Sequence, residues 1–408
     1  MASTIVFQVE CTLPQGSPTY ISGPNVRSTL GILSSIISTI IFHTWMVLHL
    51  SLPANQKTLG KGFSAWARRV WQTLWRKLEW TLVAFIMPGF VVGKALGDYI
   101  AAYRSVRCKV MQSHAKRSGT SWTMTHAFFA NMSGYILDQG DLCILMSKGL
   151  ITQLPDISED EIKDRSKEDI LVKFLALGQI AWIIVDLIAR KASGLSSTLL
   201  GVVSLNFSVC AILMYSFLLE KPKDIKEPTK IFLTRQLDDD DKDQFLWLNA
   251  TGFFRNALYQ KRTITPQQTI ENDMYNTEAR LGSLNLGVHW HITSEDIGFG
   301  LGTVMSSTIH SLAWNFAFPT WAEQTIWRSA SVYTAAVFPI YYFVMLFPFW
   351  LSQEGRLWHL VRRVIANTTY LLYAICRLFM IVEVFRSLAY LPPDAFLTTW
   401  SDIIAYIS

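Results

Sequence analysis

Ionisable side chains inside apolar stretches are the first candidates for chemistry in this chain. His43, His310, Arg377 and Glu383 each lie within a run of apolar residues. A charged side chain at the centre of a membrane helix costs at least about 2.5 kcal/mol, so such residues are usually functional or paired. We predict that His310 transfers a proton, because a neutral imidazole can both donate and accept a hydrogen bond. Glu383 and Arg386, three residues apart, also fit an ion pair on one helix face.

The segment that carries His310 holds two further candidates. It reads HSLAWNFAFPTWAEQTIWR and contains Trp314 and Asn315. The indole and amide N–H groups of these two residues are hydrogen-bond donors. They could orient an apolar substrate or stabilise charge on it.

The same segment predicts a tight helical hairpin. Pro319 is expected to end one helix, because proline lacks the N–H and its ring clashes with the preceding turn. Thr320 and Glu323 form a T-x-x-E capping box that begins the next helix. Because tryptophan is enriched where a membrane meets water, Trp321 and Trp327 are expected at that boundary.

Two polar motifs resemble metal-binding patterns, but the residues around them do not support a metal site. Asp239, Asp240 and Asp243 have the DDxxD spacing with which terpene synthases bind magnesium and diphosphate. They lie in a hydrophilic stretch without the partner motif, so we interpret them as a solvated loop. His289 and His291 lack a third ligand at a useful spacing. We predict no metal site and no cofactor.

The chain of 408 residues has 50% hydrophobic and only 16% charged residues. Soluble domains carry about 25% charged residues. Charges gather between apolar runs long enough to cross a bilayer, which needs roughly 20 residues of helix. We predict an all-α polytopic membrane protein with seven spans, near 28–50, 79–103, 170–190, 196–219, 297–318, 327–351 and 364–391.

The remaining segments are expected to lie outside the bilayer or on it. The range 63–78 has Trp and Phe on one helical face and Arg and Lys on the other, which predicts an interfacial helix. A short helix with His126 and Asn131 is expected to be re-entrant or on the surface. Ser158 and Glu161 form a cap that should begin one long helix continuing into the third span. The expected divisions are 1–27, 28–220 with a hydrophilic insert at 104–169, 221–296, 297–392 and a tail at 393–408.

Charge leaves the orientation in the membrane open. The basic ranges 51–77 and 104–117 fall on opposite sides if 79–103 is a span. They share a side if 79–103 is instead a re-entrant hairpin. The five cysteines are scattered, which argues against a disulfide framework or a zinc site. The net charge of +5 comes from membrane-flanking segments and does not indicate nucleic-acid binding.

Several pieces of the chain resemble a family of uncharacterised fungal polytopic membrane proteins. They are RSTLGILSSI (27–36), WTMTHAFFANMSGY (122–135), DRSKEDILVKFLALGQIAW (164–182), LAWNFAFPTWAEQTIWR (312–328) and LAYLPPDAF (388–396). Some relatives belong to natural-product gene clusters, so the resemblance implies a ring-forming or tailoring role. It assigns no catalytic residues.

We therefore expect an integral membrane enzyme of fungal specialised metabolism, in the endoplasmic reticulum or another endomembrane. An aromatic-rich bundle could hold an apolar terpenoid or polyketide-like substrate in a reactive shape for a cyclase or isomerase. Its expected partners are the lipid bilayer and that substrate, and the sequence does not define the oligomeric state. The alternative is a membrane transporter or a signalling or scaffold protein.

Overall fold

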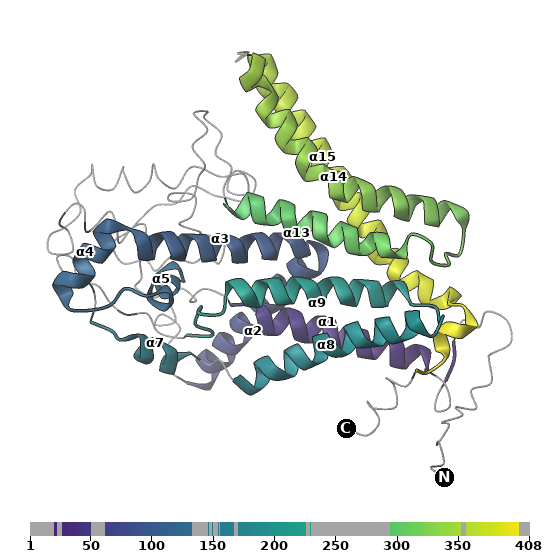
Figure 1. The fold of residues 1–408 in the computed structure, drawn as a ribbon, viewed down its shortest axis with the longest axis horizontal. Helices are drawn as coiled ribbons and strands as arrows, with labels where there is room; N and C mark the ends of the chain where they lie inside the picture. Colours follow the sequence, from purple (N-terminus) through teal and green to yellow (C-terminus); the bar gives the residue numbers. More distant parts are fainter. Residues whose placement is uncertain are drawn as a thin grey trace, which may run out of the picture. The chain divides into compact units, whose positions relative to one another are not determined.

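The computed structural model describes residues 20–22, 27–49, 62–132, 146, 149, 154, 156–166, 170–225, 229, 294–351 and 356–399. Every regular element in these ranges is a helix, which confirms the all-α fold class for this part of the chain (Figure 1). The chain divides into two compact units. Unit 1 comprises Met1–Thr44, Phe174–Cys210 and Thr303–Ser408, and unit 2 comprises Trp45–Lys173 and Ala211–Gly302.

Unit 1 is built from long helices. All or part of the following belong to it: α1 (Thr29–Val47), α8 (Ile170–Ala192), α9 (Leu199–Phe217), α13 (Ser294–His310), α14 (Trp321–Leu351) and α15 (Arg356–Arg386). Short 3-10 turns follow α13 and α15, namely η2 (Ser311–Ala313), η3 (Ser387–Tyr390) and η4 (Pro393–Phe396). The long helices α14 and α15 pack side by side (Figure 1).

Helices α1 and α8 run antiparallel. Near the start of α1, Arg27 lies 3.6 Å from Asp186, which is close to the end of α8. Further along α1, Thr39 accepts a hydrogen bond from Gln179 at 2.8 Å. Positions later in α1 therefore meet positions earlier in α8.

Local signals account for some helix ends in unit 1 and not for others. Thr320 and Glu323 form the predicted capping box, with N–H to oxygen distances of 3.0 and 3.3 Å, and α14 begins at Trp321. The prediction that Pro319 ends the preceding helix is wrong, because α13 already ends at His310 and η2 follows. At the end of α8, Gly194 has a φ of 68°, the left-handed conformation that glycine adopts most readily.

Unit 2 contains α2 (Phe63–Ile86), α3 (Pro88–Arg107), α4 (Lys109–Ser118), α5 (Met124–Asn131) and α7 (Glu159–Arg165). The predicted helix 63–78 and the start of the predicted span 79–103 form one continuous helix, α2. Pro88 then begins α3, and the two helices meet at an angle of 112°. The range 79–103 is therefore not a single straight span.

Glycines allow α3 and the first half of α13 to approach closely. A Cβ added at Gly93 would lie 2.7 Å from the backbone of Glu295 and Phe299, and one at Gly298 would lie 2.8 Å from the Cα of Gly93. Gly89 and Gly302 repeat the contact one turn away. This small-xxx-small pairing is common between membrane helices, where it lets backbones pack closely.

The short helix expected to be re-entrant or on the surface, α5, is buried in unit 2, and its His126 is held in place. The imidazole lies 2.9 Å from the Ile157 carbonyl oxygen and 2.8 Å from the Thr123 hydroxyl. Ser158 caps α7 as predicted, with the Glu161 N–H 3.1 Å from its hydroxyl. The long helix predicted from this cap is wrong, since α7 ends at Arg165 and α8 begins only at Ile170.

Several helices expose apolar side chains and bury polar ones. On α15, Leu371 and Leu378 are 64% and 63% exposed, and on α8 Phe174 is 68% exposed. On α9, by contrast, Asn206 and Ser208 are 1% and 0% exposed. Large exposed apolar side chains and buried polar ones are each less frequent in water-soluble proteins, although an apolar core is present here as well.

Among the described residues, α9 is the one helix both long and apolar enough by itself to cross a membrane. The bent pair α2 and α3 meets the same criterion only when counted together. The prediction of seven spans is therefore not confirmed as it stands. Because a core helix of a soluble protein can also meet this criterion, the exposed surfaces carry more weight.

Candidate functional site

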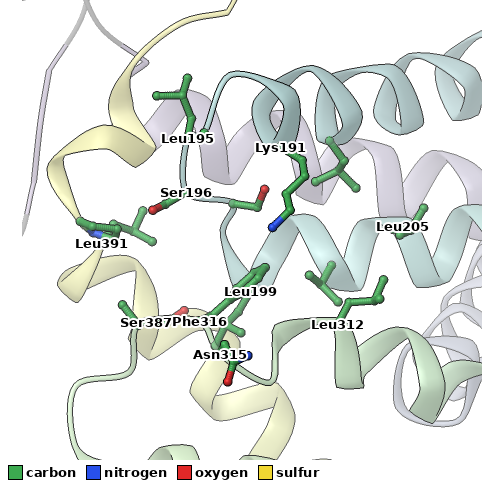
Figure 2. A pocket seen from close by; sticks show the side chains of 16 residues that line it. Lys191, Leu195, Ser196, Leu199, Leu205, Leu312, Asn315, Phe316, Ser387 and Leu391 are labelled. Atoms are coloured by element: carbon green, nitrogen blue, oxygen red, sulfur yellow. The ribbon is translucent and has the colours of Figure 1, made fainter.

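A pocket of about 590 Å³ lies in unit 1, where the ends of several helices meet. Its apolar lining comes chiefly from Leu187, Leu195, Leu199, Val202, Leu205, Leu312, Phe316 and Leu391. Its polar lining comes from Lys191, Ser196, Ser197, Asn315 and Ser387. Figure 2 shows these side chains around the opening between α8, α9 and the segments that follow α13 and α15.

One wall of the pocket is fastened by the buried side chain of Arg190. Its guanidinium donates to the Ser196 carbonyl at 2.9 and 3.1 Å, within the loop between α8 and α9. It also donates to the carbonyls of Asp394, Ala395 and Leu397 at 3.0 to 3.2 Å. Charge-assisted hydrogen bonds are stronger than neutral ones, so Arg190 holds the loop against the segment after α15.

Asp394 reinforces the same connection from the other side. Its carboxylate accepts from the Ser196 N–H at 2.9 Å and from the Ser196 hydroxyl at 2.6 Å. The Arg27 N–H donates to the Phe396 carbonyl at 2.9 Å, which adds the start of α1 to this junction. The predicted tail 393–408 thus contributes its first residues to a structured region.

Two of the residues predicted from the His310–Arg328 segment lie at or beside the pocket. Asn315 lines it, and its Oδ1 accepts a hydrogen bond from Arg328 at 3.3 Å. Trp314 is 39% exposed, and the guanidinium carbon of Arg328 lies over its indole, 5.3 Å from the ring centroid. Asn315 can therefore contact a ligand, whereas Trp314 positions Arg328.

His310 lies in the core of unit 1 and does not line the pocket. Its Nδ1 is 2.5 Å from the Ser306 carbonyl oxygen, so Nδ1 carries the proton. Trp327, predicted at the membrane boundary, is instead fully buried, and its indole donates to the His310 carbonyl at 3.2 Å. Arg377 is also buried and lies within electrostatic range of His310 and the Cys210 thiol. Proton transfer by His310 stays a prediction.

Glu383 does not form the predicted pair with Arg386. Arg386 pairs with Glu323, joining the end of α15 to the start of α14. Oε1 of Glu383 is buried without a hydrogen-bond partner in the described part of the chain. The Glu383 carboxyl group still interacts electrostatically with the charges of Glu323 and Arg386.

Other predicted residues fall outside the described residues. His43 belongs to α1, but its side chain is not described. The acidic run with Asp239, Asp240 and Asp243 and the pair His289 and His291 also lie outside. Within the described ranges, no three His, Cys, Asp or Glu side chains gather as metal ligands.

Sequence reasoning missed Lys191, Arg190 and Asp394. Arg190 ends the predicted span 170–190 and Lys191 follows it, and neither was given a role, while Asp394 was quoted only as part of the LAYLPPDAF similarity. The predicted spans 170–190 and 196–219 did imply a short connection between them. Nothing in the sequence indicated that the tail would fold against that connection.

A second buried charged cluster lies in unit 2. Asp98 on α3 lies 2.5 Å from the Lys221 ammonium and 4.0 Å from that of Lys94. Asp98 and Lys221 are 4% and 2% exposed. Because the three charges neutralise one another in part, this cluster has a structural role that needs no ligand.

The comparison with known families matches residues 3–251, more than half of the chain, to one described as Family of unknown function (DUF8562). The chain belongs to this family. No curated protein and no solved structure gives a significant match. The family assigns no activity, so function must be argued from the geometry.

Proposed function

We propose that the protein crosses the bilayer six times, through α1, α8, α9, α13, α14 and α15. The exposed apolar faces of these helices support the proposal, because large apolar patches in water mark contact with lipid or protein. Helix α2 adds an interfacial surface. Its Phe63, Trp66 and Trp71 are 81%, 58% and 65% exposed, while Lys77 on another face is buried against Asp224 at 2.8 Å.

The order of the helices supports six crossings over seven. Since α1 and α8 run antiparallel, the start of α1 and the end of α8 share one side of the membrane. The chain between them must then cross an even number of times. A single crossing at 79–103 does not fit, whereas the 112° bend between α2 and α3 fits a re-entrant pair.

This arrangement gathers basic segments on one side. The described basic ranges 62–77, 104–117, 221–225 and 356–363 would all lie on the side opposite the two termini. Loops rich in Lys and Arg face the cytosol. We therefore assign those segments to the cytosol and both termini to the opposite side.

We further propose that the protein is an enzyme of fungal specialised metabolism, in the endoplasmic reticulum or another endomembrane. The observation that carries this proposal is the pocket, which combines an apolar lining with a few polar groups, as small-molecule sites do. Its substrate would be an apolar terpenoid or polyketide-like intermediate. The resemblance to fungal proteins of natural-product clusters supports the biological setting.

A cyclisation or isomerisation suits such a site. In a pericyclic ring closure the substrate's own π electrons form the new σ bond, so no co-reactant is needed. The protein contributes orientation, which can lower a barrier substantially, and a donor such as the Asn315 amide. Leu199, Leu205 and Phe316 would exclude water from the folded chain of the substrate.

Microsomes containing the full-length protein test the enzyme proposal. Incubated with acyclic pathway intermediates, they should yield an isomer of unchanged mass and altered retention time. Leu312→Trp, which fills the pocket, should reduce conversion at least about tenfold. Leu371→Trp, on the exposed face of α15, is the matched control and should retain activity. An unchanged product profile after deletion of the gene from its producer would refute the proposal.

A transporter is the second candidate. Buried polar atoms without hydrogen-bond partners among the described residues include Ser204, Asn206 and Ser208 on α9, Ser306 on α13, Ser331 on α14 and Glu383 on α15. Polar groups inside a membrane bundle are typical of ion or proton paths. In proteoliposomes with a pH-sensitive dye, a proton flux abolished by Glu383→Gln would favour transport over catalysis.

A further inference from the structure

Among the described residues that line the pocket in unit 1, Lys191 alone carries a charged side chain. Lys191 lies in the last turn of α8, and Figure 2 shows it extending among the lining residues. Within the described part of the chain, its ammonium has no hydrogen bond or ion pair. The neighbouring Arg190, in contrast, is fully engaged by backbone carbonyls.

The Asp394 carboxylate in this junction already has hydrogen-bond partners. The Asp394 carboxylate accepts two hydrogen bonds from Ser196, so it is held on that residue. Among the residues that the structure describes, no Asp or Glu lines the pocket. The positive charge of Lys191 therefore lacks a carboxylate in the lining and can attract an anion from a ligand.

Asn315, another polar residue of the lining, also presents a donor. Because Arg328 donates to Oδ1 of Asn315, the Asn315 amide has its N–H groups left to donate. A cation and an amide donor match the oxygen atoms of a carboxylate or phosphate. The apolar remainder of the lining matches a hydrocarbon body.

We infer that this pocket binds an amphiphile with one anionic group, a carboxylate or phosphate, on an apolar chain or ring system. The volume of about 590 Å³ lies within the range of roughly 300–1,000 Å³ for small-molecule sites. The inference deepens the proposed function by naming a substrate class. It concerns binding, which does not depend on turnover.

Binding to the full-length protein in nanodiscs of uncharged phosphatidylcholine tests this inference. The probe is a fluorescent sixteen-carbon fatty acid, and its methyl ester is the uncharged comparator. We expect the acid to bind about tenfold more tightly than the ester, as a charge-assisted contact implies. Unlabelled lysophosphatidic acid as competitor separates a phosphate-bearing lipid from a free carboxylate as the preferred source of the anion.

Variants assign the effect to Lys191. Lys191→Met keeps the aliphatic stem and should weaken acid binding about tenfold without changing ester binding. Lys191→Arg should restore the preference for the acid. Lys116→Met, at an exposed lysine in the last turn of α4, is the matched control and should leave both affinities unchanged.

Equal affinity for acid and ester, or acid binding unaffected by Lys191→Met, would overturn the inference. A thermal unfolding curve of each variant excludes misfolding as the cause of lost binding. Leu312→Trp should weaken acid and ester alike, which places both in the pocket. Acid binding without conversion of any substrate would keep this inference and remove the enzyme proposal, so the two can fail separately.

Discussion

Asp98 is 4% exposed on α3, with Lys221 at 2.5 Å and Lys94 at 4.0 Å. Asp98 lies within the range 79–103 that was predicted as a span, and the sequence alone does not identify its partner. Lys221 lies 123 positions away, at the beginning of a segment that was interpreted only as a hydrophilic loop. A buried charge of this kind is stable only while its partner is present.

We predict that removing the Asp98 charge and removing the Lys221 charge lower the stability of the fold by different amounts. Asp98→Asn leaves Lys221 and Lys94 facing each other and should destabilise the fold by about 3 kcal/mol or more. Lys221→Met should cost less, because Lys94 still faces Asp98. Thermal unfolding in detergent measures both, with Asp156→Asn on the surface as the control. Equal losses for the two variants would contradict this account.

Acidification should weaken α7 through Glu159. The Lys163 ammonium, 2.6 Å away, and the Thr123 and Thr125 hydroxyls lower the pKa of Glu159 below its usual 4.5. Because the folded pKa is depressed, the stabilisation is complete above about pH 4.5 and is lost as the pH falls through the folded pKa.

The pH dependence can be measured against Glu159→Gln. At pH 7 the free energy of unfolding of the variant should be lower than that of the wild type by about 0.3–0.5 kcal/mol, as expected for an exposed ion pair. The difference should shrink as the pH falls below 4. A difference that does not change with pH would assign the effect to packing.

Between elements, α3 and the first half of α13 make a close backbone contact. Gly89 and Gly93 face Gly298 and Gly302, so the backbones meet without intervening side chains. The four glycines belong to segments separated by about two hundred residues of chain. Neither segment alone shows that the other is its partner.

Gly93→Ala should separate these two helices. The added methyl would lie 2.7 Å from backbone atoms of Glu295 and Phe299, which cannot rotate away as a side chain could. We expect a loss of about 1–3 kcal/mol, typical of overpacking. Gly178→Ala, with no atom within 4 Å, is the control and should be neutral or stabilising in its helix. Similar melting temperatures for both variants would argue against the close contact.

At the scale of the whole molecule, the number of crossings decides where the termini lie. Six crossings place both termini on one side, whereas the seven spans predicted from the sequence would place them on opposite sides. The hydrogen bond from the Arg27 N–H to the Phe396 carbonyl, 2.9 Å long, is consistent with a shared side.

Glycosylation mapping tests this topology. Acceptor tags at the two ends should both be modified in the endoplasmic reticulum. The natural acceptor sequence Asn249-Ala250-Thr251 lies in a segment assigned to the cytosol and should remain unmodified. A tag inserted after Gly119 should also stay unmodified. Modification of only one terminus would show that the number of crossings is odd and would contradict this topology.

The features that sequence reasoning predicted correctly are local. The caps at Ser158 and Thr320 and the helical class depend on residues within a few positions of one another. The end of α13 and the separation of α7 from α8 were missed, because packing of other segments overrides such signals. Of the predicted site residues, Asn315 lines the pocket, while His310 is enclosed by Trp327.

By itself, the sequence determined that this chain is helical, rich in apolar surface and charged mainly between its apolar runs. Those properties follow from hydrophobic periodicity and from capping within single turns. Only the tertiary structure decided that Trp327 is buried, that Arg190 fastens the tail to a distant loop, and that Lys191 lines a pocket. Burial and pairing depend on which segments meet in space, and that is a property of the whole fold.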